Sequence, residues 1–209
     1  MRQKHCRLCQ ALMDGLEDGE IRPCNTVLLK TPRFVVVPAI GPLVCGHALV
    51  VSRDHYNCLA SMPEEGIAEY ERIAKVLSLL PQIRGNLLEA EHGPTGECNA
   101  GACVAHTHVH LLPSLGGHHD FLQGRFSVLR RVNTLTDICG MTDPYIMVRG
   151  IRDEAVFYDA ESAPSQAIRR VLCERLGDPA WDWRLAPRYQ EIEATVRFWE
   201  DALQHAEIA

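Results

Sequence analysis

Three histidines alternate with apolar or β-branched residues in the stretch Ala-His-Thr-His-Val-His-Leu-Leu-Pro, residues 105–113. Because side chains of a β-strand alternate between two faces, we expect His106, His108 and His110 to share one face and the residues between them to be buried on the other. Each imidazole carries a donor and an acceptor, which an apolar core cannot satisfy three times over. The row therefore predicts metal binding or catalysis. A surface histidine cluster is the alternative, and the aliphatic neighbours disfavour it.

Composition and charge exclude several classes of partner. The chain has 209 residues, of which 46% are hydrophobic and 23% charged, and its net charge is −6. This length suits one large domain or one domain with an extension. An acidic chain has no broad basic field for long nucleic acid, although a local basic pocket for a phosphorylated small molecule is compatible with it. No apolar run reaches membrane-spanning length and no signal-peptide core precedes the first strand, so we expect no membrane partner and a cytoplasmic location.

Nine cysteines are many for this length. Their odd number and scattered spacing argue against a disulfide framework and favour a reducing compartment. Five of them lie among apolar or turn residues, where we expect small buried hydrophobes: Cys24, Cys45, Cys58, Cys139 and Cys173. Cys6 and Cys9 differ because they form Cys-x-x-Cys, and residues 1–15 are interpreted as a short metal knuckle.

Hydrophobic periodicity and turn residues predict a mixed chain. Strands are expected at 27–29, 34–37, 48–51, 86–90, 146–148 and 155–158, and helices at 63–80, 164–176 and 187–205. Ser61-Met62-Pro63-Glu64 is interpreted as a capping box that opens the first of these helices. Residues 116–120 are interpreted as a polar linker with His118 and His119 exposed to solvent. The pattern favours an α+β fold with a mostly antiparallel sheet.

Three motifs in order carry a resemblance to a known family. The stretch from His106 to Leu112 resembles the signature of the histidine triad (HIT) nucleotide hydrolases and transferases. Residues 44–55 resemble the upstream Gly-His strand of that family, and Glu91-His92-Gly93 resembles the segment that precedes the triad strand. The resemblance covers residues 6 to 114. It implies a HIT-like catalytic domain over 1–115 with an N-terminal zinc knuckle, in which helices flank the sheet, and an α/β C-terminal extension over 116–209 packed on that core.

The resemblance also assigns roles to the histidines. His108 would be the nucleophile, His110 would contact phosphate oxygens and help the leaving group depart, and His47 would lie near the same phosphate. A neutral imidazole is a good nucleophile at physiological pH, which suits attack on phosphorus. Backbone N–H groups around Gly101 and Cys103 would bind the phosphate as an anion nest. Relatives often carry serine at the Cys103 position, so a hydroxyl contact would be lost here.

A second constellation has the ligand types of a tetrahedral zinc site, and some family members hold a structural zinc in this way. Its members are Cys6, Cys9, His55 and His106, with His55 eight residues after His47. Zinc there would fix the first triad histidine and thereby orient the nucleophile two residues later. The alternatives are a cysteine pair without metal, and His5 as a ligand.

Two features depart from the commonest family pattern. Many relatives place Asp or Asn eight residues before the Gly-His histidine to bind ribose, and Ala39 stands there in this chain. Phe34 or Ile40 would line a base pocket or else belong to the core.

The C-terminal extension offers candidate phosphate ligands. Gln166 and either Arg169 or Arg170 stand at helix spacing from one another, so that they could reach the same substrate phosphate. The forked guanidinium of arginine suits phosphate geometry. The alternative is a solvated helix face that Trp181 and Trp183 anchor to the core.

The function implied is hydrolysis of a nucleotide phosphoanhydride or phosphoramidate through a nucleotidyl-histidine intermediate, with release of a nucleoside monophosphate. A nucleotidyltransferase or phosphorylase of the same family, or a non-catalytic zinc-stabilised nucleotide-binding module, is the alternative. Relatives specialised for transfer to sugars often replace the third histidine with glutamine, so His110 favours hydrolysis. The expected partner is a nucleotide or nucleotidylated small molecule. Homodimers are common among resembling proteins, although the extension could cover that surface.

Overall fold

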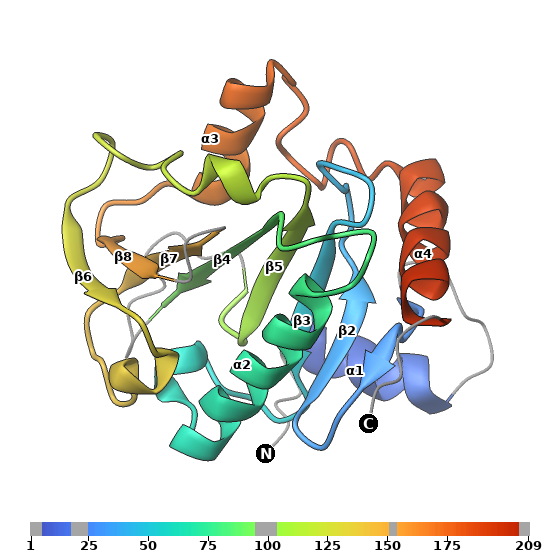
Figure 1. Ribbon diagram of the computed structural model, residues 1–209, viewed down its shortest axis with the longest axis horizontal. Coiled ribbons are helices and arrows are strands. Elements are labelled where there is room, and N and C mark those ends of the chain that lie inside the picture. Colours follow the sequence, from blue (N-terminus) through green and yellow to red (C-terminus); the bar gives the residue numbers. More distant parts are fainter. Residues whose placement is uncertain (1–5, 18–24, 95–103, 151–153, 205–209) are drawn as a thin grey trace.

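One antiparallel sheet organises the chain. The computed structural model describes residues 6–17, 25–94, 104–150 and 154–204. Within these ranges eight strands pair in the order β1-β2-β3-β5-β4-β7-β8-β6, and every pair is antiparallel (Figure 1). The strands are β1 (Leu29–Lys30), β2 (Phe34–Pro38), β3 (Ala48–Ser52), β4 (Leu87–Gly93), β5 (His108–Pro113), β6 (Val128–Val132), β7 (Tyr145–Arg149) and β8 (Ala155–Asp159). The predicted α+β class with an antiparallel sheet is confirmed.

The helices cover both faces of the sheet. They are α1 (Arg7–Glu17), α2 (Glu64–Ser78), α3 (Ala167–Leu176) and α4 (Tyr189–Gln204), with 3-10 turns η2 (Leu59–Ser61), η3 (Gly116–His118) and η4 (Leu135–Ile138). One face packs against α2, whose buried Ile67, Tyr70 and Leu77 recur at helical spacing. Trp199 of α4 belongs to the same core.

The opposite face is covered in two parts. Leu12 of α1 packs on Val35 and Val51 at the β1–β3 end of the sheet. At the β4–β8 end, α3 packs its apolar side on residues such as Leu88 and Leu112. Helices α1 and α2 therefore lie on opposite sides of the sheet (Figure 1).

The strand register decides which face carries the histidines. His108 pairs with Val51 and His110 pairs with Leu49 across β3, and residues directly opposite one another share a face. Both histidines therefore lie on the face of α1 and α3, on the central strand between the two coverings. The residues that alternate with them are buried as predicted: Thr107, Val109 and Leu111.

The sheet continues without a break past residue 115. Ala90 of β4 pairs with Val148 of β7, so the last three strands extend the sheet that holds the histidines. Indole Nε1 of Trp199 donates a hydrogen bond of 2.8 Å to the carbonyl of Gly46, which joins α4 to the segment before His47. The proposed boundary between residues 115 and 116 stays a prediction.

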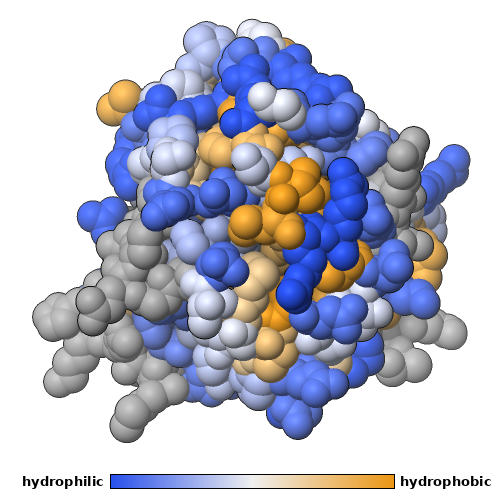
Figure 2. Space-filling view, turned by 90° about the vertical axis from the view of Figure 1, so that its left-hand side faces the viewer, coloured by the Kyte–Doolittle hydropathy of each residue, from blue (hydrophilic) through white to orange (hydrophobic). Residues whose placement is uncertain are grey.

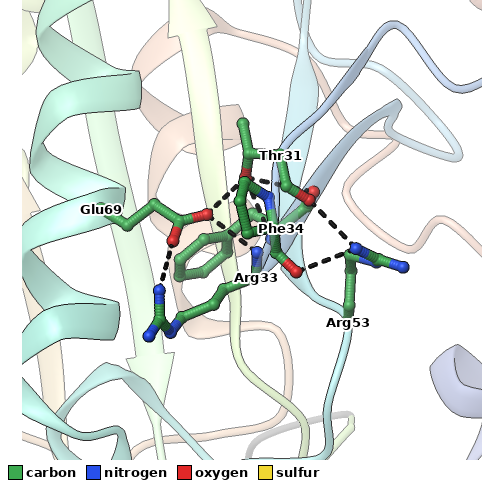
Figure 3. Close-up of polar contacts among 6 residues, drawn as sticks. Thr31, Arg33, Phe34, Arg53 and Glu69 are labelled. Carbon is green, nitrogen blue, oxygen red and sulfur yellow. Dashed lines mark hydrogen bonds and ion pairs between the residues drawn. The ribbon is translucent and has the colours of Figure 1, made fainter.

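A polar clamp fixes the turn between β1 and β2. Glu69 of α2 accepts hydrogen bonds from the hydroxyl of Thr31 at 2.7 Å and from the amide of Arg33 at 2.8 Å, and it pairs with the Arg33 guanidinium at 2.9 Å (Figure 3). Arg53 donates to the carbonyls of Thr31 and Pro32 from the other side. Burial raises the pKa of the Glu69 carboxyl, but these hydrogen bonds outweigh it and hold the pKa below its ordinary value.

The free edge of the sheet at β6 is protected against further pairing. Figure 2 views this side, where a narrow band of hydrophobic side chains lies among strongly hydrophilic ones. Val128 and Leu129 are exposed there, next to the exposed Arg130 and Arg131, and a register shift follows Val128. Charges and irregular register on an edge strand discourage edge-to-edge association.

Among the described residues, none of the helices has the length and apolarity that crossing a bilayer requires.

Some local predictions were wrong, and others stay open. Cys6 and Cys9 lie at the start of an eleven-residue amphipathic helix, and the predicted metal knuckle over residues 1–15 stays a prediction. Helix α2 has Pro63 as N-cap with no side-chain cap, since the Ser61 hydroxyl instead bonds to the carbonyl of Cys58 at 2.7 Å in η2. The predicted polar linker contains the 3-10 turn η3, and this turn leaves His118 and His119 partly buried.

Other differences concern cysteines and element bounds. Cys58 and Cys173 are buried as expected, whereas Cys45 and Cys139 are exposed, because both lie in connections rather than in strands or helices. Cys24 lies outside the described residues. The first strand is shorter than predicted, and β6 was missed because four of its five residues are exposed and show no alternation.

Candidate functional site

His47, just before β3, and His110 of the adjacent strand β5 form a hydrogen-bonded pair. Nε2 of His47, which precedes β3, lies 2.9 Å from Nδ1 of His110 in β5. The backbone amide of Leu43 lies 3.1 Å from Nδ1 of His47. An amide can only donate, so Nδ1 of His47 accepts and its Nε2 carries the proton. His47 therefore donates to Nδ1 of His110, and the proton of His110 must be on its own Nε2.

The neighbouring histidine has the opposite arrangement. Nδ1 of His108 lies 2.7 Å from the backbone carbonyl of His106. A carbonyl can only accept, so Nδ1 carries the proton and Nε2 keeps its lone pair. The rings of His108 and His110 have centroids 5.6 Å apart. The strand therefore presents, side by side, an imidazole with a free lone pair and an imidazole with a free N–H donor.

The surroundings keep these rings neutral. Burial lowers the pKa of His108, and the bond to the His106 carbonyl only partly opposes this effect. Burial also lowers the pKa of His47 well below its ordinary range, and the charge of Arg169 lowers it further. The pKa of His110 is lowered in the same way, first by burial and then by His47, His108, Arg169 and His92. A neutral ring is the form that can act as nucleophile.

The predicted metal ligands come together. The ligand atoms of Cys6, Cys9, His55 and His106 all lie within 4.8 Å of one another. Nδ1 of His106 is 3.3 Å from the sulfur of Cys6 and 3.4 Å from that of Cys9, and Nδ1 of His55 is 3.5 Å from the sulfur of Cys9. Two sulfurs and two ring nitrogens thus surround one point between α1 and the start of the triad stretch.

The chemistry of this donor set fits a tetrahedral metal. With zinc–sulfur bonds of about 2.3 Å and zinc–nitrogen bonds of about 2.0–2.1 Å, sulfur and nitrogen ligands are separated by about 3.5 Å. The observed separations of 3.3 to 3.5 Å match that spacing. Nε2 of His106 lies 2.7 Å from the carbonyl of Ser52, so Nε2 carries the proton and Nδ1 is the free ligand atom. Burial lowers the pKa of His106 to about 4, which keeps the ring neutral as coordination requires.

An apolar groove lies on the histidine face. Its walls come from α1, the segment before β1, β2 with the residues after it, and β3, and the lining includes Leu8, Leu12, Val37, Ile40 and Leu49. Leu49 pairs with His110, so the groove adjoins the triad strand on the same face. Ile40 is 38% exposed and lines the groove, whereas Phe34 is buried in the α2 core. Of the two candidates for a base pocket, the structure therefore places only Ile40 at this surface.

The predicted phosphate ligands have other partners. Gln166 donates to Asp182 at 2.9 Å, and the guanidinium of Arg170 lies 3.5 Å over the ring of Trp181. Both side chains contact other residues of the extension, and their role at a phosphate stays a prediction. Gly101 and Cys103 lie outside the described residues, as does His5.

Two residues near the histidines were missed or misplaced by sequence reasoning. His92 of β4 is buried and, two residues after Ala90, shares the face of His110, with which Ala90 pairs. Period-two alternation, continued past the predicted end of that strand, would have found it. Arg169 is buried against the segment before His47, whereas a run of two arginines suggested a solvated helix face.

Comparison with known proteins identifies the domain. Residues 22–116, slightly less than half of the chain, match the family model of the HIT domain. HIT domains are typically nucleotide hydrolases or transferases. No curated protein matches the chain.

Similar solved structures cover about half of this chain. A hypothetical histidine triad nucleotide-binding protein from Sulfolobus tokodaii is 22% identical, with 51% of this chain and 68% of that chain covered and a TM-score of 0.40. A Hit-like protein involved in cell-cycle regulation from Bartonella henselae is 14% identical over 56% and 85%, with a TM-score of 0.41. A hypothetical protein from Leishmania major is 25% identical over 52% and 72%, with a TM-score of 0.39.

Proposed function

We propose that this chain hydrolyses a nucleotide phosphoanhydride or phosphoramidate through a nucleotidyl intermediate on His108 and releases a nucleoside monophosphate. The observation that carries the proposal is the pair of opposite tautomers on β5. His108 bears a free lone pair on Nε2, and His110 bears a free N–H on Nε2. A nucleophile beside a hydrogen-bond donor is what attack on a phosphate group needs.

The first step exchanges one bond to phosphorus for another. The lone pair on Nε2 of His108 attacks the phosphorus next to the nucleoside, a P–N bond forms, and the bond from phosphorus to the leaving group breaks with its electron pair. His110 donates its Nε2–H to a phosphate oxygen as charge develops there, and the leaving group takes its proton from this donor or from solvent. The proton on Nδ1 of His108 stays bonded to the His106 carbonyl, which stabilises the positive ring of the intermediate.

The second step restores the enzyme. Water attacks the phosphorus, its hydroxyl stays on the nucleoside monophosphate, and its proton goes to Nε2 of His110, if that nitrogen gave its own to the leaving group, or otherwise to solvent. The P–N bond breaks and its electron pair returns to Nε2 of His108. An acceptor other than water would make the same intermediate serve transfer. Relatives specialised for transfer to sugars often carry glutamine in place of the third triad histidine. The histidine at position 110 therefore supports water as the acceptor.

The apolar groove supports a nucleobase as the recognition element. It adjoins His110 and is lined mostly by aliphatic side chains, which suit a flat, poorly hydrated ring. Ala39 is buried and offers no side-chain acceptor for ribose hydroxyls. The groove therefore favours the base over the sugar as the basis of affinity.

The cluster of Cys6, Cys9, His55 and His106 supports a structural zinc ion. When bound, the metal would supply no chemistry to the reaction, because all four ligand positions are filled by protein atoms. These residues instead hold α1, which forms one wall of the groove, against the segment that leads into β5. His106 thereby sets the position of the carbonyl that orients His108.

The test is release of nucleoside monophosphate from a panel of adenylylated and guanylylated compounds with P–O and P–N leaving groups. We expect turnover by the wild type, loss of at least about 10³-fold in His108→Ala, and little change in His118→Ala, which removes a partly buried histidine of η3. Turnover unaffected in His108→Ala would refute the catalytic assignment. Binding of the panel without any turnover would instead support the non-catalytic module.

A further inference from the structure

A buried arginine from the extension reaches the segment that carries His47. Arg169 of α3 is 4% exposed. Its Nε donates to the carbonyl of Trp181 at 2.7 Å, and its terminal nitrogen donates to the carbonyl of Gly41 at 2.7 Å. A guanidinium is always charged and has a rigid fork of N–H donors. When it is buried, it keeps its charge and must hold its hydrogen-bond acceptors in fixed positions.

The extension holds the same segment at several other points. Gly41 donates its amide to the carbonyl of Pro187 at 2.8 Å, and Arg188 donates to the carbonyl of Pro42 at 3.2 Å. Gly41 has a φ of +63°, and a Cβ there would meet the Ala186 carbonyl at 2.7 Å. The loop is thus packed too closely against the extension to carry a side chain at this position. The Leu43 amide that sets the tautomer of His47 belongs to this fixed loop.

The charge of Arg169 also acts on both members of the histidine pair. Burial is the largest cause of the lowered pKa of His47, and the charge of Arg169 is the next. The same charge contributes to the lowered pKa of His110. The other titratable groups that act on the pair are His108 of β5 and His92 of β4. Asp178 and Asp182 also respond to Arg169, after their stronger bonds to Arg188 and Gln166.

Protonation would break the arrangement in a specific way. A proton on Nδ1 of His110 would point at the Nε2–H of His47, and two donors 2.9 Å apart cannot bond. We propose that Arg169 is a positioning residue, by which the C-terminal extension fixes the loop before His47 and keeps the His47–His110 pair in its neutral, hydrogen-bonded form. The catalytic consequence rests on the proposed function, whereas the effect on the pair does not.

The experiment follows the histidine rings themselves. Imidazole titrations by NMR on uniformly ¹⁵N-labelled, metal-loaded protein would compare the wild type with Arg169→Gln, Arg169→Lys and Arg175→Gln. Arg169→Gln removes the charge and keeps an amide donor, and we expect the titration midpoint of His47 or His110 to rise by about 0.5 to 1 unit. Arg169→Lys restores the charge and should return the midpoint toward that of the wild type. Arg175, exposed on the same helix and paired with Asp120, is the matched control and should change nothing.

The pH profile of kcat/KM gives the second readout. Its acid limb should move to higher pH in Arg169→Gln and return in Arg169→Lys, whereas a merely structural role would lower activity equally at every pH. Unchanged midpoints in a folded Arg169→Gln protein would overturn the proposal. If that variant fails to fold, wild-type rings that titrate near the ordinary value of about 6.5 would overturn it as well. A wild type inactive on every nucleotide would refute the proposed function while leaving the titration test intact.

Discussion

Nε2 of His47 donates to Nδ1 of His110 across 2.9 Å, although 63 residues separate the two along the chain. The direction of this bond is set by a third group, the backbone amide of Leu43, which can only donate to the other nitrogen of His47. The tautomer of His110 is therefore determined by the main chain of a loop, and that loop is held by the C-terminal extension. The triad strand depends on residues on both sides of it in the sequence.

The metal cluster should anchor α1. We expect about one zinc ion per chain in the wild type, and loss of that metal in Cys9→Ser with a decrease in stability on the order of a few kcal/mol. Atomic emission gives the metal content, and thermal unfolding gives the stability. The matched control is Cys139→Ser, which changes an exposed cysteine away from the cluster and should leave both unchanged. A wild type that binds no zinc, or equal stability of the Cys9→Ser protein, would contradict this account.

The groove should contribute to affinity rather than to chemistry. Ile40→Ser removes an aliphatic side chain from its lining, and we expect KM to rise by about 3- to 10-fold with kcat changed less than about 2-fold. Leu79→Ser is the control, because Leu79 is 69% exposed just after α2, on the other side of the sheet. Steady-state kinetics at several nucleotide concentrations separates the two constants. A fall in kcat with unchanged KM would remove the groove from substrate recognition.

Much of this arrangement could be read from the sequence, for identifiable reasons. Period two around Val109 placed His108 and His110 on one face. The expectation that His47 lies near His110 and His55 at the metal cluster came from the family resemblance, and the structure brings these residues together. The antiparallel sheet followed from short strands with few helical crossovers.

Other features depend on tertiary contacts that no local pattern reveals. Arg169 and Arg170 are adjacent, yet one is buried on the carbonyl of Gly41 and the other lies on the ring of Trp181. Only the path of the extension decides which arginine reaches the loop before His47. Strand β6 has exposed residues at four of its five positions, so its pairing with β8 left no hydrophobic signal.

A buried carboxyl outside the histidine site makes stability depend on pH. Burial raises the pKa of Glu91 to about 7, against the opposing hydrogen bonds from the hydroxyl of Tyr145 at 2.5 Å and the amide of Leu59 at 2.9 Å. The folded protein therefore binds this proton more tightly than the unfolded chain does. The resulting stability is complete below about pH 4.5 and is lost as the pH rises through about 7, a change on the order of 3 kcal/mol.

The variant Glu91→Gln removes this titration while keeping the size of the side chain. We expect the stability of the wild type, measured relative to Glu91→Gln, to fall as the pH is raised from 5 to 8. Urea unfolding of both proteins at each pH measures the difference, and the titration of all other groups cancels in it. A difference that stays constant over this range would show that the carboxyl is already ionised in the folded protein at pH 5.

Covalent catalysis by His108 is the central claim, and intact mass after rapid quenching without acid tests it most directly. Acid is avoided because a P–N bond hydrolyses readily at low pH. We predict that the wild type, mixed with a nucleotidylated substrate, gains the mass of one nucleotidyl group, that peptide mapping places this group on His108, and that His108→Ala gains none. An adduct of equal yield on His108→Ala, or wild-type turnover with no adduct at any time point, would contradict the account.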